Sequence, residues 1–287
     1  MPEWLRGFQE FSDRLLKVSR DVRDLHKDPL NKHATTIRGA NNAIWAGADA
    51  DGAAQFGATA SGVAPPEMAG RADELLRNIY GNRFHTSGSP ATRANADSLI
   101  SAPEGWHRVV ASNMKEEPHG GLWLGDGSLL DLGHPAHSAK SPDEPLPHRT
   151  DGMTWGEVPG AYAVKYRALL VGNTRYSRPG TASHEFTHAF DHAVGSPSSG
   201  SDFAEVYAQV KPLIEHEVPP HIWTLPDGGK REIFAEGGAW LNQNRRILFG
   251  DADHTIQPTF FNSAAAGHHM KEYFQHLESN LQRLMIL

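Results

Sequence analysis

Apolar residues recur at helical spacing between Thr181 and Gly195, and this pattern predicts a helix with one face in a core. The apolar stripe consists of Ala182, Phe186, Ala189, Phe190 and Ala193. The residues off the stripe include His184, Glu185, His188 and Asp191. Thr181 is a plausible N-cap, and Gly195 is a natural stop. We therefore expect a helix that buries one face and lines a cleft with the other.

A second helical pattern opens with Lys230, directly after a turn over residues 227–229. Its apolar faces are supplied by Ile233, Phe234, Ala235, Ala239, Trp240 and Leu241. Gly237 and Gly238 fall in its middle, where each costs about 1 kcal/mol relative to alanine. Such a cost suggests a packing reason, for instance close approach to the first helix.

The remaining pattern is less regular. Residues 3–28 have a helical rhythm and predict a helix packed on the body, with a partner-binding helix as the alternative. Residues 46–70 are rich in Ala, Gly, Ser and Pro and are typical of a linker. Residues 71–80 predict a short helix, and residues 133–152 resemble a long loop.

Four segments predict strands. Residues 106–112 form the first, and residues 122–124 and 128–130 form a hairpin around the turn at 125–127. Residues 162–171 form a strand directly before the first helix. Because this strand is expected at a sheet edge, it could pair with an extended substrate peptide through Tyr162, Arg167, Leu169 and Val171. An ordinary edge strand is the alternative.

Composition limits the class of function. A chain of 287 residues suits one large or two modest domains. A net charge of −7 argues against a nucleic-acid binder. No apolar run is long enough to span a membrane, and the first 30 residues show no signal-peptide core. The absence of cysteine excludes disulfides and thiolate metal sites.

The segment 184–188 reads His-Glu-Phe-Thr-His. Residues four apart share a helix face, so His184 and His188 could bind one metal ion while Glu185 takes a proton from water. Because the chain contains 17 histidines, coincidence on a solvated surface helix is the competing interpretation. The apolar stripe behind the motif argues against it.

A catalytic zinc site needs a third protein ligand. His192 is excluded because it lies eight residues from His184, about 12 Å along a helix. Asp191 is better interpreted as a group that orients an imidazole, with an N–H acceptor or a surface charge as the alternative. Glu232 is the stronger ligand candidate, and Glu236 shares its helix face. Both glutamates could otherwise be ordinary surface residues.

Three blocks resemble the anthrax lethal factor-like and Pro-Pro endopeptidase-like zinc metalloproteases, which are HExxH zincins. They are residues 160–162 together with 167–172, residues 184–191 and residues 232–236, and the resemblance covers roughly residues 150 to 285. It implies His184, His188 and Glu232 as ligands of one Zn²⁺ and Glu185 as general base. It also implies that Asp191 and Glu236 support the ligands.

One position departs from that family. The family carries a tyrosine seven residues before the ligand glutamate, where it assists the transition state, and this chain has Leu225 there. A developing oxyanion still needs a donor besides the metal. His221, Tyr207 and Arg231 are the candidates.

We therefore expect an α+β fold, with a zincin-like domain whose small mixed sheet packs on the HExxH helix. The expected divisions are 1–70, 71–150 and a catalytic region over 151–287. The resemblance implies a zinc endopeptidase acting on a protein or peptide substrate, a host protein among the candidates, secreted without a Sec signal peptide as a toxin or effector. The alternatives are an inactive protein-binding domain and a cytoplasmic small-molecule metallohydrolase. A weaker second metal candidate is the loop trio His134, His137 and His148.

Overall fold

The computed structural model describes residues 71–147, 152–178, 180–227, 229–245 and 260–284. Within these ranges the chain forms seven α-helices and one small mixed sheet, which confirms the α+β class. The helix predicted over residues 3–28, the linker predicted over 46–70 and His148 lie outside them. None of the described helices combines the length and the apolarity needed to cross a membrane.

The four strands form a sheet in the order β1-β2-β4-β3. They are β1 (Phe84–Thr86), β2 (Gly121–Leu124), β3 (Gly160–Ala163) and β4 (Ala168–Val171). Strand β2 pairs in parallel with both β1 and β4, whereas β3 pairs with β4 antiparallel. Strand β3 is therefore an edge strand, and β4 is paired on both sides.

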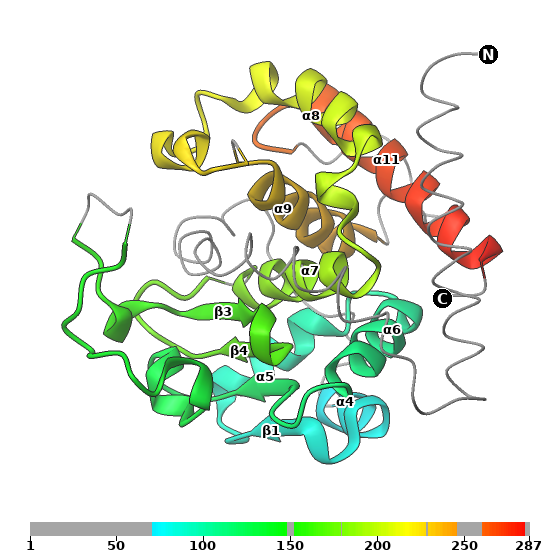
Figure 1. Ribbon diagram of the computed structural model, residues 1–287. Helices are drawn as coiled ribbons and strands as arrows, with labels where there is room; N and C mark the ends of the chain where they lie inside the picture. The colour runs from blue at the N-terminus through cyan, green and yellow to red at the C-terminus, as the bar shows by residue number, and fades with distance from the viewer. Residues whose placement is uncertain (1–70, 148–151, 179, 228, 246–259, 285–287) are drawn as a thin grey trace, which may run out of the picture.

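Helix α7 lies between the sheet and helix α9 (Figure 1). Helices α5 and α6 also contact α7, and α8 and α11 pack with α9 on its other side. The helices are α4 (Ala72–Tyr80), α5 (Pro90–Leu99), α6 (Glu104–Met114), α7 (Thr181–Ala193), α8 (Ser201–Ile214), α9 (Lys230–Gln243) and α11 (Ala264–Arg283). The predicted helices over 71–80, between Thr181 and Gly195, and from Lys230 are confirmed.

The two faces of the sheet belong to different cores, because successive side chains of a strand point to opposite faces. The face toward the helices carries Leu122, Leu124, Tyr162, Leu169 and Val171. The other face packs Ala161, Ala168 and Leu170 against residues of the segment 129–158. The helices therefore cover one face and this mostly irregular segment covers the other.

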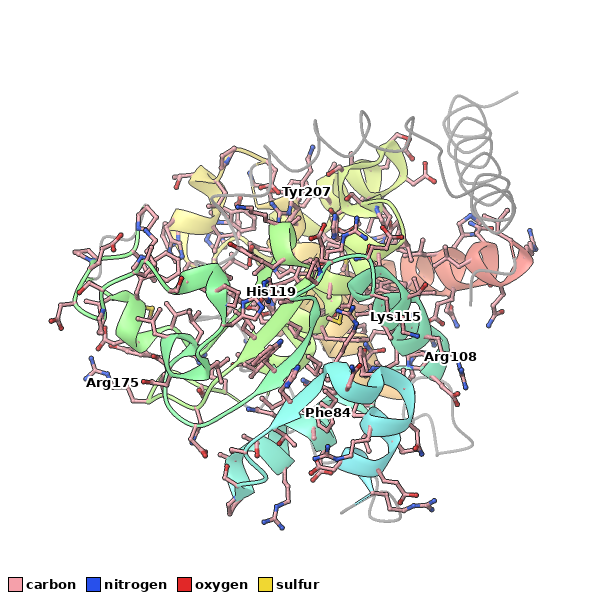
Figure 2. All side chains as sticks on the ribbon, turned by 60° about the horizontal axis from the view of Figure 1, so that its bottom comes forward. Phe84, Arg108, Lys115, His119, Arg175 and Tyr207 are labelled. Atoms are coloured by element: carbon pink, nitrogen blue, oxygen red, sulfur yellow. The ribbon has the colours of Figure 1, made fainter. Side chains whose placement is uncertain are left out.

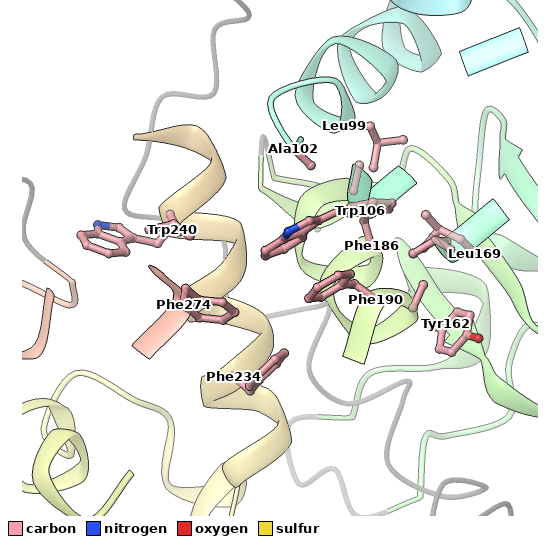
Figure 3. Close-up of a cluster of buried hydrophobic side chains, with 14 of the residues drawn as sticks. Leu99, Ala102, Trp106, Tyr162, Leu169, Phe186, Phe190, Phe234, Trp240 and Phe274 are labelled. Atoms are coloured by element: carbon pink, nitrogen blue, oxygen red, sulfur yellow. The ribbon is translucent and has the colours of Figure 1, made fainter. Parts of the chain in front are cut away.

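An aromatic cluster joins helices α6, α7, α9 and α11 (Figure 3). Trp106 of α6 stacks on Phe190 of α7, with ring centroids 3.8 Å apart and planes 5° apart. Phe234 of α9 lies against Phe274 of α11, with centroids 5.0 Å apart. Such pairs contribute about 0.5–1.5 kcal/mol each beyond their buried area. The cluster therefore helps to fix α7 relative to α9.

The strand predicted over residues 106–112 is wrong, because this segment lies in helix α6. Trp106, Val110 and Met114 recur at a spacing of four and are buried, whereas Arg108 points outward (Figure 2). The adjacent valines at 109 and 110 favour a strand locally. Burial of one helical face outweighs that preference.

The hairpin predicted over residues 122–130 is also wrong. Residues Leu129–Leu132 form a 3₁₀ helix, and the Asp131 carboxylate accepts hydrogen bonds from the backbone N–H and the hydroxyl of Ser128. Strand β2 takes its partners from β1 and β4, which are distant in sequence. Local turn residues cannot reveal such parallel pairing.

The single strand predicted over residues 162–171 is two strands. Strands β3 and β4 are separated by the 3₁₀ turn Val164–Tyr166 and by Arg167, which has a left-handed backbone with φ of 48°. The segment is therefore a hairpin, and its second strand is inside the sheet.

The two mid-helix glycines of α9 do have packing reasons. A Cβ atom on Gly238 would lie 2.4 Å from Thr187 Cγ2 of α7, and one on Gly237 would lie 1.8 Å from Met270 Cε of α11. Gly238 thus marks close approach to α7, as predicted, whereas Gly237 serves the contact with α11.

We expect Gly238→Ala to lower the free energy of unfolding by about 1 kcal/mol, measured by urea denaturation. Alanine gains about 1 kcal/mol of helix propensity, but overlap with Thr187 costs about 1–3 kcal/mol. In a Thr187→Ser background, which lacks the clashing methyl group, the same substitution should be less harmful. A Gly238→Ala protein more stable than wild type would contradict the close contact.

Candidate metal centre

Helix α7 buries its polar face as completely as its apolar stripe. Ala182, Phe186, Ala189 and Phe190 lie in the main core. His184, Glu185, His188 and Asp191 are each no more than 1% exposed. The expectation that this polar face lines an open cleft is therefore wrong, because α9 packs directly against α7.

Three side chains from α7 and α9 converge on one point. His184 Nε2 lies 3.1 Å from His188 Nε2, and the two oxygens of Glu232 lie 3.3 Å from His184 Nε2 and 3.5 Å from His188 Nε2. Among the described residues this is the one group of three potential ligands with atoms within 4.8 Å of one another. The sequence prediction of these three residues as a ligand set agrees with their placement.

The group fits a metal ion on two further observations. Tetrahedral zinc with bonds of 2.0–2.1 Å would separate its ligand atoms by about 3.3–3.4 Å, close to the 3.1 Å between the two imidazole nitrogens and the 3.3 Å between His184 Nε2 and one oxygen of Glu232. Both carboxylate oxygens of Glu232 are buried and lack a hydrogen-bond partner among the described residues. A carboxylate buried in this way is costly unless a cation compensates it. The site could therefore hold a metal ion.

Glu236 contacts His184, the first candidate ligand. Its Oε1 lies 3.0 Å from His184 Nδ1, one turn of α9 beyond Glu232. A carboxylate in this position fixes the imidazole so that the opposite nitrogen, Nε2, points at the candidate metal position.

The electrostatics of the group differ between its two histidines. Burial acts to lower the pKa of His184, but the adjacent carboxylates of Glu232 and Glu236 outweigh burial and raise this pKa well above its ordinary value. Burial lowers the pKa of His188 to about 4. Burial acts to raise the pKa of Glu232, yet the imidazoles of His188 and His184 hold this pKa well below its usual range. In the metal-free protein at neutral pH, His184 thus carries a proton and His188 does not.

Glu185 lies beside His184 and against the sheet. Its Oε2 accepts a hydrogen bond of 2.8 Å from the backbone N–H of Tyr162, and its charge contributes to the raised pKa of His184. Edge strand β3 therefore holds the predicted general base.

Asp191 does not orient a ligating imidazole, and that prediction is wrong. Its carboxylate accepts hydrogen bonds from the Ser198 backbone N–H at 2.9 Å and the Ser198 hydroxyl at 2.6 Å. The turn after α7 brings Ser198 back under the helix end, so the N–H acceptor alternative describes Asp191. Burial raises its pKa to about 6.

His192 is absent from the ligand group, as expected from its distance along the helix. Its Nδ1 lies 2.8 Å from the Tyr162 hydroxyl. The loop histidines His134 and His137 do not form a metal group within the described part of the chain. His134 uses both ring nitrogens, since Nδ1 accepts from the Ala136 N–H and Nε2 lies 3.0 Å from the His119 carbonyl oxygen.

The candidate transition-state donors lie in different places. Arg231 is buried directly before Glu232, and its charge acts to lower the pKa values of His188 and Asp191. Tyr207 packs on Phe203 and Trp223, and burial raises its pKa to about 12. His221 lies in the 3₁₀ turn Pro220–Thr224. The charge of Arg231 thus acts directly on His188, one of the candidate ligands.

The predicted substrate strand needs correction. Leu169 and Val171 belong to β4, whose backbone is paired on both sides and cannot accept another strand. Arg167 donates from Nη1 to the Asn113 carbonyl oxygen at 3.0 Å and pairs with Glu116. Of the four proposed residues, Tyr162 alone lies on edge strand β3.

Two features near the site were missed from the sequence. The N–H of Tyr162 that anchors Glu185 is a backbone group and has no sequence signature. Arg178, in the turn before α7, acts to lower the pKa of Glu236. The position of Arg178 just before helix α7 could be read from the sequence. That position alone does not show that Arg178 acts on Glu236, which lies on helix α9.

No protein-family model matches this chain, and a search of curated protein sequences finds no significant relative. The side chains described above therefore carry the functional interpretation.

We expect zinc binding to the metal-free protein at pH 7 to release about one proton, because His184 must lose its Nε2 proton to become a ligand. Affinity should rise with pH until the raised pKa of His184 is passed. Calorimetric titration in buffers of different ionisation enthalpy measures this release. Glu236→Gln removes one carboxylate that raises the pKa of His184, so this variant should release fewer protons when it binds zinc. Absence of proton release from wild type would contradict the assigned protonation.

Proposed function

We propose that this protein is a zinc-dependent endopeptidase of the zincin type. The convergence of His184, His188 and Glu232, with ligand atoms 3.1–3.5 Å apart, is the observation that carries the proposal. Two imidazoles and one carboxylate leave a fourth position open, which is typical of catalytic rather than structural zinc. The resemblance of the 184–191 and 232–236 segments to zincin proteases supports the same reaction.

His184, His188 and Glu232 would hold the zinc ion, which supplies Lewis acidity and makes a bound water more acidic. Glu236 keeps the His184 ring oriented through Nδ1. Glu185 takes a proton from the attacking water and returns it to the leaving amine. Since Oε2 is held by the Tyr162 N–H, Oε1 is the atom that carries this proton.

We propose Arg231 as the hydrogen-bond donor to the developing oxyanion. It would replace the tyrosine of the zincin family, whose position is occupied by Leu225 in this chain. It is buried beside Glu232, and its charge acts on His188. A fixed cation near a developing oxyanion lowers the barrier most effectively in a water-poor site.

The proposed substrate is a peptide or protein segment, an assignment that rests on the resemblance. Edge strand β3 is itself buried on α7, and its outward Tyr162 N–H is bonded to Glu185, so β3 does not offer a free edge for pairing with a substrate. Secretion as an effector and a host protein as substrate remain proposals that rest on the resemblance alone.

A second candidate, a metallohydrolase for a small molecule, is favoured by the burial of the site. The three ligands are each 1% exposed and Glu185 is 0% exposed. A closed site of this kind accepts a compact substrate more readily than an extended chain.

We expect the isosteric variant Glu185→Gln to retain about one zinc ion per chain and to lose cleavage by at least about 100-fold. Metal analysis combined with a proteome cleavage screen measures both. The exposed glutamate of α8 gives a control, Glu205→Gln, which should match wild type.

Wild-type protein without zinc, or undiminished cleavage by Glu185→Gln, would contradict the mechanism. Zinc-dependent hydrolysis of small esters or amides without any peptide cleavage would favour the second candidate.

A further inference from the structure

We propose that Tyr162 and His192 are positioning residues that hold edge strand β3 on helix α7 and thereby fix Glu185. This inference rests on the proposed function, because it concerns the general base of that reaction. It assigns a role to His192, which the geometry of the helix excludes as a ligand.

The backbone of β3 presents Tyr162 N–H away from the sheet. Gly172 N–H donates to the Pro159 carbonyl oxygen at 2.7 Å, so residues 159 and 172 form a hydrogen-bonded pair. In an antiparallel ladder such pairs alternate with pairs that are not hydrogen-bonded. In the observed register Tyr162 lies opposite Leu169, three positions from that pair, so the Tyr162 N–H points outward. Its partner is Glu185 Oε2, at 2.8 Å.

The side chain of Tyr162 returns to the same helix at a second point. Its hydroxyl lies 2.8 Å from His192 Nδ1, and Asn113 of α6 donates from Nδ2 to that hydroxyl at 3.3 Å. Glu185 and His192 are seven residues apart, about two helical turns, and therefore share a face of α7. The fully buried Tyr162 of edge strand β3 thus contacts α7 at both Glu185 and His192.

Close packing makes the strand and Glu185 move together. A Cβ atom on Gly160 would lie 3.2 Å from Thr181 Cγ2 and 3.3 Å from Glu185 Cγ. The start of β3 therefore rests directly on the stem of the catalytic candidate. A shift of β3 along α7 would change the direction of the Glu185 carboxylate.

The contact between the Tyr162 hydroxyl and His192 can be removed while the Tyr162 N–H that bonds Glu185 is kept, because the two groups are separate parts of the residue. Tyr162→Phe keeps the ring and the N–H and removes the contacts of the hydroxyl with His192 and Asn113. His192→Leu removes the same link from the other side, whereas His192→Asn places a polar atom near the former position of Nδ1 and should restore part of the effect.

Tyr80→Phe is a matched control. The Tyr80 hydroxyl lies 3.0 Å from Nδ1 of the buried His107, so this variant loses the same kind of contact between α4 and α6. Neither residue contacts the ligand group in the described structure.

For zinc-loaded protein we expect Tyr162→Phe and His192→Leu to lower kcat about ten-fold, in line with the loss of a supporting contact. KM should stay within about two-fold and zinc content should match wild type, because the ligands are untouched. His192→Asn should regain part of kcat, and Tyr80→Phe should keep all of it.

Amide hydrogen exchange gives a readout that does not need activity. The Tyr162 N–H should be protected in wild type and Tyr80→Phe, with and without zinc, and should exchange at least about ten-fold faster in Tyr162→Phe and His192→Leu. If the Tyr162 N–H exchanges at the wild-type rate in both Tyr162→Phe and His192→Leu, the proposal that the Tyr162–His192 contact holds β3 on α7 is overturned. Faster exchange with unchanged kcat would overturn the role of this contact in positioning Glu185. If wild type cleaves nothing, the proposed function fails, and exchange alone then decides whether the contact holds β3 on α7.

Discussion

Gly238 of α9 meets Thr187 of α7 at a point where a Cβ atom on Gly238 would overlap the Thr187 methyl group. This contact allows the two helix axes to approach closely, so that short imidazole and carboxylate side chains reach a common point. A larger residue at 238 would push α9 away and separate Glu232 from both histidines. The stacked rings of Trp106 and Phe190 join α7 to helix α6.

Because the same close packing buries several carboxylates, the site has a high desolvation cost unless cations balance their charge. Glu185, Glu232 and Glu236 are at most 3% exposed, and one protonated imidazole lies among them. Buried charges of one sign are tolerated when they are paired or coordinate a metal. The backbone N–H of Tyr162 satisfies one oxygen of Glu185, and His184 meets Glu236. The two oxygens of Glu232 lie 3.3 and 3.5 Å from imidazole nitrogens and have no hydrogen-bond partner among the described residues, so a metal ion that replaces the His184 proton could bind there.

Local periodicity was enough to predict helix α7, helix α9 and the packing reason for Gly238. These features depend on residues three or four apart, where helix geometry decides which side chains share a face. The sheet was predicted poorly, since β2 pairs in parallel with segments far away in sequence. Burial of the polar face of α7, the capture of Asp191 by Ser198 and the anchoring of Glu185 by a backbone N–H depend on tertiary contacts, which a pattern of residues does not contain.

X-ray absorption at the zinc edge of the purified, zinc-loaded protein tests the central claim most directly, because it reports the ligands themselves. The account predicts one zinc site per chain with two imidazoles and oxygen ligands at about 2.0–2.2 Å. In a Glu232→Ala protein the two imidazoles should remain while zinc binds more weakly. A spectrum with three or more imidazoles, or a protein that does not retain zinc at all, would contradict the assignment of His184, His188 and Glu232 as the metal centre.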